Sequence, residues 1–166
     1  MKRSLAAPLK IQVAAATVLA AALTGCSTGS TSGTEAAAEP TSTTSVDPDA
    51  FPVTIEHALG ETTIESEPTR VATLGWTDHD HAVALGVVPV GATKITWGGN
   101  EGGSTDWFDE AVEEAGAEAP VRYDDSDGAP IDEVAELAPD LILATNSGIT
   151  DAEYAKLSKI APVVAY

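Results

Sequence analysis

The chain has 166 residues, with 26 acidic against 8 basic side chains and a formal charge of −18. Three of the basic residues lie in the first 25 positions, so the remainder carries five basic and 26 acidic side chains, a charge of −21. Such a surface repels nucleic acid and anionic lipid, which excludes a nucleic-acid-binding role and a basic membrane-binding patch. The single cysteine, Cys26, excludes a disulfide within the chain.

The first 25 residues are predicted to be a secretory signal peptide. A basic start over 1–10 precedes an apolar run over 11–23, which is shorter than the about 20 residues of a membrane span. The run ends in LTGC at 23–26, which resembles the lipobox of bacterial lipoproteins. The resemblance implies cleavage before Cys26 and lipidation of its sulfur, which would anchor the chain to a membrane. The alternative is a free or structural cysteine after an uncleaved signal.

Residues 26–50 are predicted to form a disordered tether that starts at the lipidated cysteine. The stretch is rich in Ser, Thr, Ala and Pro and has no apolar periodicity. Apolar alternation begins near Phe51, so residues 51–166 are predicted to form one small domain. A predicted core strand over 163–165 stands at the very end of the chain, where it would normally need more sequence to cover it. The chain is therefore expected to be a fragment.

Two alternating apolar runs, 53–55 and 62–64, predict a β-hairpin at the edge of a sheet. Residues 71–97 then read as a strand, a helix and a second strand. The strand over 71–74 is broken by Gly75, and Thr77 is predicted to cap a helix whose N3 residue is Asp80. The side chains of Ala82, Val83 and Leu85 are expected to face inward, and Gly86 to end the helix before a strand around 87–92.

The segment over 98–103 is rich in glycine and is interpreted as a hinge or lid, because no basic residue of the P-loop kind follows it. Apolar residues at helical spacing predict a helix around 107–115, with Trp107 in the core. The acidic turn over 124–128 does not complete an EF-hand loop and is interpreted as solvated. The remaining predicted elements are a strand over 120–123, a helix beginning at Pro130, a strand over 141–144, a helix with the capping box Thr150 and Glu153, and a strand over 163–165.

Strands that alternate with helices predict an α/β fold, an open and mostly parallel sheet with flanking helices. In such sheets the ligand lies beyond the carboxyl ends of the strands. Trp76 and Trp97 both follow predicted strand ends, where a flat apolar face can pack on a chelate or macrocycle. Their alternative role is packing in the core.

Four segments, in this order and spacing, resemble the first lobe of iron-siderophore and vitamin B12 type substrate-binding proteins of ABC importers. They are GETTIESEPTRVATL at 60–74, ALGVVPVGA at 84–92, IDEVAELAPDLILAT at 131–145 and YAKLSKIAPVVAY at 154–166. The resemblance implies two lobes joined by a long helix, with the ligand between them, and it implies that this chain supplies the first lobe.

The resemblance also implies roles for individual residues. The loops that line the cleft in the family map onto Trp76 and Thr77, onto 94–97 with Lys94 and Trp97, and onto Asn146 and Ser147. The acid that contacts the permease maps to Asp132, where the family usually has glutamate. The shorter Asp132 leaves open whether it or Glu133 makes that contact.

The run Asp78-His79-Asp80-His81 invites a metal-binding interpretation, to which the alternative is a purely structural role. Four consecutive residues fan around a helix, whereas helical zinc sites usually use residues one turn apart. Helix capping and the helix dipole explain the two aspartates, so no metal site is predicted. No pairing of a nucleophile with a base is visible, and neither catalysis nor a resident cofactor is expected.

The sequence thus predicts a lipid-anchored, monomeric solute-binding protein at the outer face of the cytoplasmic membrane. It would capture a ferric siderophore and deliver it to an ABC permease. Only Arg70 and Arg122 could bind a catecholate complex by bidentate contacts, and neither is predicted at a strand's carboxyl end, which favours a neutral or cationic hydroxamate ligand. The alternatives are a binder of cobalamin, haem or free metal with the same fold, and a surface adhesion or signalling lipoprotein.

Overall fold

The computed structural model describes residues 47–166. The predicted signal peptide, the lipidation of Cys26 and nearly all of the predicted tether lie outside the described residues, and they stay predictions. The last residues of the predicted tether form a short 3-10 turn, η1 (Pro48–Ala50), where the Asp47 side chain accepts a hydrogen bond from the Asp49 amide at 2.9 Å.

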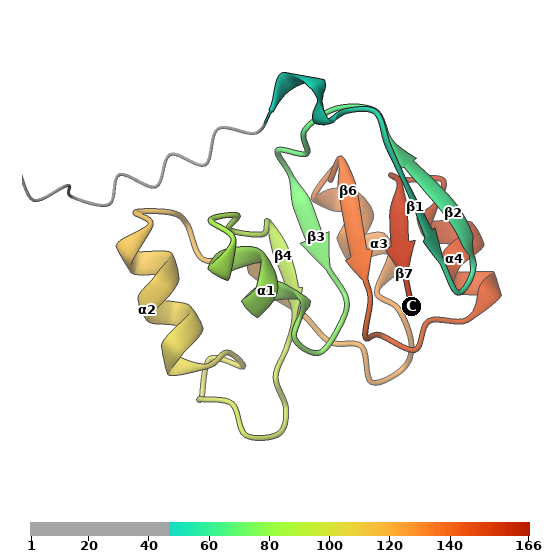
Figure 1. The fold of residues 1–166 in the computed structure, drawn as a ribbon. Helices are drawn as coiled ribbons and strands as arrows, with labels where there is room; N and C mark the ends of the chain where they lie inside the picture. The colour runs from blue at the N-terminus through green and yellow to red at the C-terminus, as the bar shows by residue number, and fades with distance from the viewer. Residues whose placement is uncertain (1–46) are drawn as a thin grey trace, which may run out of the picture. The chain divides into compact units, whose positions relative to one another are not determined.

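The centre of the fold is a five-stranded sheet in which every neighbouring pair of strands is parallel (Figure 1). Its strands are short, and all but one edge strand are almost entirely buried, as expected of parallel strands that are covered on both faces. This confirms the predicted open α/β sheet. In spatial order the strands are β5 (Val121–Tyr123), β4 (Gly91–Thr93), β3 (Val71–Thr73), β6 (Leu141–Ala144) and β7 (Val163–Ala165).

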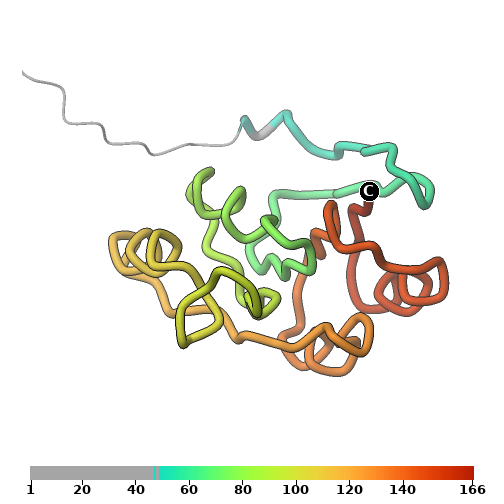
Figure 2. Tube along the Cα trace, turned by 90° about the horizontal axis from the view of Figure 1, so that it is seen from below, coloured from blue at the N-terminus to red at the C-terminus, as the bar shows by residue number. Residues whose placement is uncertain are grey.

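Two pairs of helices connect these strands and pack on the sheet. The first pair, α1 (Asp78–Ala84) and α2 (Asp106–Glu114), links β3 to β4 and β4 to β5. The second pair, α3 (Ile131–Glu136) and α4 (Asp151–Leu157), links β5 to β6 and β6 to β7 on the opposite face (Figures 1 and 2). The chain therefore reverses its direction across the sheet between β3 and β6, which places the topological switch point there. Within the described range, every helix is too short or too polar to cross a membrane.

Carboxylate and arginine side chains tie β3 to β6 at their amino ends. The Asp140 carboxylate accepts hydrogen bonds from the amides of Thr69 and Arg70, each at 2.8 Å, and from the Thr69 hydroxyl at 2.8 Å. The Arg70 guanidinium donates to the carbonyls of Leu137 and Ala138 at 2.6 and 3.2 Å, where it caps the end of α3. Arg70 therefore lies at the edge of the sheet opposite the predicted ligand site.

Gly91 allows Tyr123 to cross the middle of the sheet. A Cβ atom on Gly91 would lie 2.7 Å from the Tyr123 ring and 2.3 Å from the Leu137 side chain. With hydrogen in that place, the ring lies across β4 and its hydroxyl donates to the Thr73 carbonyl of β3. Burial raises the pKa of Tyr123, so the phenol stays a donor.

The predicted hairpin is confirmed, but its predicted place at the edge of the main sheet is wrong. Strands β1 (Val53–His57) and β2 (Gly60–Ile64) pair antiparallel in a two-stranded sheet of their own. The hairpin contacts β7 through side chains instead of a backbone ladder. The Thr62 hydroxyl donates to the Val163 carbonyl at 2.6 Å, and Ile64 packs with Val164.

Two predicted core residues are exposed. Leu85 is 77% exposed, because α1 ends at Ala84 and the chain turns there at Gly86, whose φ is +86°. Trp107 is 52% exposed, because Phe108 and Val112 form the buried face of α2. Helical spacing identified α2 correctly but did not fix which of two adjacent aromatic residues faces inward.

Thr62→Val should destabilise the fold by about 1–3 kcal/mol, because it leaves the buried Val163 carbonyl and the His57 ring without the hydroxyl that both contact. Chemical unfolding of the natural protein measures the change. Thr63→Val is the matched control, since the Thr63 hydroxyl is exposed and, among residues 47–166, forms its hydrogen bond with Thr54 on the neighbouring strand. Equal losses for both variants would contradict the role given to Thr62.

Candidate functional site

The loops after β3, β4 and β6 meet at the carboxyl edge of the sheet. Because the three strands are neighbours in the order β4-β3-β6, their loops are neighbours as well. Trp76 is 43% exposed and Trp97 is 79% exposed, so both indole rings are available to a ligand. These loops carry all six residues predicted to bind the ligand, which are Trp76, Thr77, Lys94, Trp97, Asn146 and Ser147.

A buried carboxylate joins the β3 loop to the β6 loop. Asp78 is 2% exposed, and its Oδ2 accepts hydrogen bonds from the amides of Gly75 and Thr145, both at 3.0 Å. Its Oδ1 accepts a hydrogen bond from the Thr145 hydroxyl. Next to this cluster the Trp76 amide donates to the Asn146 carbonyl at 3.1 Å. Four of the predicted ligand-binding residues, on two segments far apart in sequence, are thereby held together.

The interpretation of Asp78 as a helix cap is corrected by this geometry. Thr77 occupies the N-cap position of α1 without a side-chain cap, and the Asp78 carboxylate bonds to loop groups instead of the helix's own amides. The sequence placed Asp78 correctly at a helix start. Its partner Thr145 is 67 positions away, and spacing alone could not reveal that contact.

The loop after β4 is closed by its own hydrogen bonds. The Ile95 amide donates to the Gly103 carbonyl at 2.8 Å. The Asn100 Oδ1 accepts from the amides of Gly102 and Ser104 at 3.0 and 3.1 Å. The Asn100 amide group in turn donates to Asp106 and Asp109 of α2 at 3.1 and 2.8 Å, which fixes the turn to the helix. A hinge or lid role for this loop stays a prediction.

Arg122 supports the same loop from inside the lobe. Its guanidinium donates to the Thr93 carbonyl at 3.1 Å and to the Ser104 hydroxyl at 2.6 Å. Its Cζ atom lies 4.7 Å from the centre of the Phe108 ring, a cation–π contact. Burial lowers the pKa of Arg122. The sequence did not place this arginine near a strand's carboxyl end, yet its charged group reaches the end of β4.

The two histidines of the run Asp78-His79-Asp80-His81, for which no metal site is predicted, lie in different surroundings. His79 is fully buried, with its ring centre 5.0 Å from that of Phe108 in an edge-to-face contact. Burial lowers the pKa of His79, which favours the neutral ring. His81 is exposed. In the described part of the chain, no cluster of three His, Cys, Asp or Glu side chains has metal-binding geometry.

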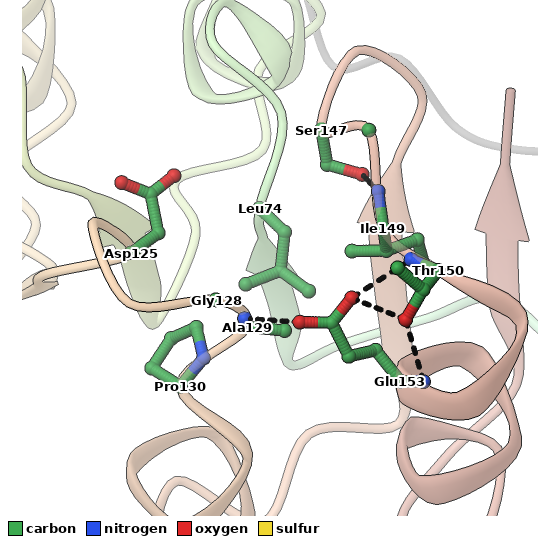
Figure 3. A pocket seen from close by; sticks show the side chains of 10 residues that line it. Leu74, Asp125, Gly128, Ala129, Pro130, Ser147, Ile149, Thr150 and Glu153 are labelled. Atoms are coloured by element: carbon green, nitrogen blue, oxygen red, sulfur yellow. Dashed lines mark hydrogen bonds between the residues drawn. The ribbon is translucent and has the colours of Figure 1, made fainter.

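A cavity of about 320 Å³ opens beside the loops that follow β3 and β6 (Figure 3). Glu153 forms one wall, where its carboxylate accepts hydrogen bonds from the amides of Ala129 and Thr150 at 2.8 Å and from the Thr150 hydroxyl at 2.6 Å. This confirms the predicted capping box of α4. These hydrogen bonds, led by that from the Thr150 hydroxyl, lower the pKa of Glu153 to about 2. Other lining residues include Leu74, Asp125, Pro130, Ser147 and Ile149.

The predicted permease-contacting residues lie at the start of α3, which follows the carboxyl end of β5. Asp132 and Glu133 are both exposed in the first turn of α3, after Pro130 at the N-cap position. Together with Lys156 of α4 they line a shallow groove. This groove shares Ala129 and Pro130 with the cavity that Ser147 of the β6 loop also lines.

Comparison with known proteins identifies the family. Residues 71–166 match the family model described as periplasmic binding protein. The chain belongs to this family. The match extends from β3 to the end of β7 and thus covers the whole parallel sheet.

Three relatives of this periplasmic binding protein chain bear names that concern solute or iron uptake. The probable siderophore-binding lipoprotein YfiY of Bacillus subtilis is 31% identical over 112 residues, which are 67% of this chain and 32% of YfiY. The iron uptake protein PiaA of Streptococcus pneumoniae, solved with ferrichrome, is 43% identical with a TM-score of 0.61 to 0.65 across two structures and covers 69% of this chain. A periplasmic solute binding protein of Mycobacterium smegmatis is 45% identical, with a TM-score of 0.61 and 68% coverage. The chain spans 38% of each of the ferrichrome-bound PiaA and M. smegmatis chains, and thus little more than a third of these relatives' length.

Glu153→Gln should flatten the pH dependence of stability in acid. A carboxyl group whose pKa is lowered from 4.5 to about 2 stabilises the fold fully above pH 4.5, and this contribution is lost as the pH falls toward 2. The difference in unfolding free energy between the wild type and Glu153→Gln should therefore shrink over that interval. Urea unfolding at several pH values measures it. Glu136→Gln, at an exposed position on α3, is the control, and the same pH profile for both variants would contradict the assignment.

Proposed function

We propose that this chain forms the first lobe of a solute-binding protein that captures a ferric siderophore for an ABC importer. The observation that carries the proposal is the pair of exposed tryptophans, Trp76 and Trp97, on neighbouring loops at the carboxyl edge of the parallel sheet. This edge is where open α/β sheets bind ligands. The siderophore-related names of YfiY and PiaA support the same ligand class.

The proposed site consists of Trp76, Thr77, Lys94, Trp97, Asn146 and Ser147. The two indole faces would pack on the apolar surface of the chelate, and the polar side chains would orient it. A second lobe would close over the opposite face of the ligand, which remains bound as cargo.

The charges of this lobe favour a neutral or cationic hydroxamate complex. Arg70 is engaged with the end of α3 at the opposite edge, and Arg122 is hydrogen-bonded inside the lobe. Neither guanidinium is free to form the bidentate contacts that a highly anionic catecholate complex would attract. Ferrichrome, the ligand in the PiaA structure, is a ferric trihydroxamate.

Delivery would use the surface at the start of α3. Asp132 or Glu133 would meet a basic residue of the permease, and a lipid on Cys26 would hold the monomeric protein at the outer face of the cytoplasmic membrane. Both carboxylates are exposed, which supports a role in contact with a partner.

Truncation of either tryptophan should weaken ferrichrome binding by about tenfold or more, as expected for a central aromatic contact. Calorimetric titration of the natural full-length protein that carries this chain measures the affinity of Trp76→Ala and Trp97→Ala. Trp107→Ala is the matched control, because Trp107 is 52% exposed, between the values for Trp76 and Trp97, but lies on α2. Tight binding of ferric enterobactin without binding of ferrichrome would overturn the hydroxamate assignment. Absence of binding to either complex would overturn the proposed function.

Substitution of the permease contact should impair uptake without changing affinity. Asp132→Asn and Glu133→Gln, compared separately, decide which carboxylate makes the contact. We expect one of them to reduce uptake of iron-55 ferrichrome severalfold in cells while the calorimetric affinity stays that of the wild type. Glu136→Gln, near the end of the same helix, controls for general loss of surface charge. Wild-type uptake by the Asp132→Asn/Glu133→Gln double variant would contradict the proposed contact.

A further inference from the structure

The Asp78 carboxylate is buried without a cationic partner. It is 2% exposed, and in the part of the chain that the structure describes no Lys, Arg or His forms an ion pair with it. Burial of a charge is costly unless hydrogen bonds compensate for it. Here the compensation comes from Gly75 and Thr145, one residue on each of two separate loops. Asp78 therefore stabilises a particular arrangement of those loops.

The β3 loop is shaped to accept this carboxylate. A Cβ atom on Gly75 would lie 2.2 Å from the Asp78 Oδ2, a distance that no side chain could tolerate. The absence of a side chain at Gly75 lets the backbone amide approach Oδ2 to 3.0 Å. Trp76 follows directly, and its own amide bonds to the Asn146 carbonyl of the second loop at 3.1 Å. The backbone leading into the Trp76 Cα atom is thus fixed.

We propose that Asp78 is a positioning residue for ligand capture, which holds the Trp76 loop and the Asn146 loop as one preformed wall. This inference rests on the proposed function and names a residue that would act through Trp76 and Asn146 without touching the ligand. Ordering a loop on binding costs free energy, and a loop that is already ordered avoids that cost. The Oδ2 position must hold an acceptor, because two backbone amides donate to it. An amide could fill both positions only with its NH₂ group at the Thr145 hydroxyl and that hydroxyl turned to accept, and it would lose the negative charge that strengthens all three hydrogen bonds.

Asp78→Asn tests the proposal with two readouts on the natural full-length protein. The affinity for ferrichrome should fall about tenfold. In a background of Trp97→Phe and Trp107→Phe, Trp76 is the one tryptophan left among the three within residues 1–166. If the remainder of the natural protein contains others, they are replaced as well. The fluorescence anisotropy of Trp76 should then decay faster in Asp78→Asn than in the same background with Asp78 intact, without any ligand present.

Substitutions of Thr145, which donates to the same carboxylate, should give a graded series of affinities. Thr145→Val removes the hydroxyl and keeps the amide, so it should produce a smaller loss of affinity than Asp78→Asn. Thr145→Ser retains both donors and should restore the wild-type affinity and anisotropy. Thr145→Val should add little in the Asp78→Asn background, because the two changes break the same contact. If Asp78→Asn fails to fold, the Val and Ser variants carry the test.

Ile64→Ala controls for a loss of stability alone. Ile64 is 7% exposed in β2 and packs with Val71, Leu141 and Val164, in a cluster that contains no residue of either loop. We expect it to lower the unfolding free energy while the anisotropy of Trp76 and the affinity stay those of the wild type. Unchanged anisotropy and affinity in both Asp78→Asn and Thr145→Val would overturn the proposal. A wild-type protein that binds no siderophore would overturn the proposed function instead, and the ligand-free anisotropy would still decide the role of Asp78.

Discussion

Two carboxylates hold the central strands β3 and β6 together, one at each end. Asp78 ties their carboxyl ends through Gly75 and Thr145, and Asp140 ties their amino ends through the backbone of Thr69 and Arg70. The chain reaches β6 only after it has formed β4 and β5 on the other side of β3. These two contacts therefore join parts of the chain about 70 residues apart, at the switch point of the sheet.

The binding surface follows from that junction. Parallel strands direct their loops to one edge, and the Asp78 contact converts two of those loops into a single surface with Trp76 exposed on it. The third loop, which carries Trp97, is ordered separately through Asn100 and Arg122. An exposed aromatic on a rigid backbone contacts a ligand at little entropic cost, which is what the proposed capture of a dilute chelate would require. Arg70 is engaged with the end of α3 at the amino edge of the sheet, and Arg122 is engaged with the loop after β4, so neither guanidinium is free at the surface that carries the tryptophans.

The sequence was sufficient for the order of elements and for placing the predicted site residues on neighbouring loops, while their binding of a ligand stays a prediction. Buried strands, the Thr150–Glu153 capping box and the glycine at the end of α1 are local signals, and the structure confirms each of them. It was insufficient wherever a residue's environment depends on distant segments. Asp78 looked like a helix cap because its partner Thr145 is remote, and Trp107 looked buried because adjacent Phe108 satisfies the same periodicity. The hairpin's place depended on a hydroxyl contact to β7 that no pattern encodes.

The central claim is that the wall formed by the β3 and β6 loops exists before any ligand binds. Amide hydrogen exchange of the ligand-free protein, resolved residue by residue, tests it most directly. The amides of Gly75, Trp76 and Thr145 all donate to acceptors within the two loops. We expect these three amides to exchange as slowly as those of the neighbouring strands. Exchange at the rate of an exposed loop would contradict the claim.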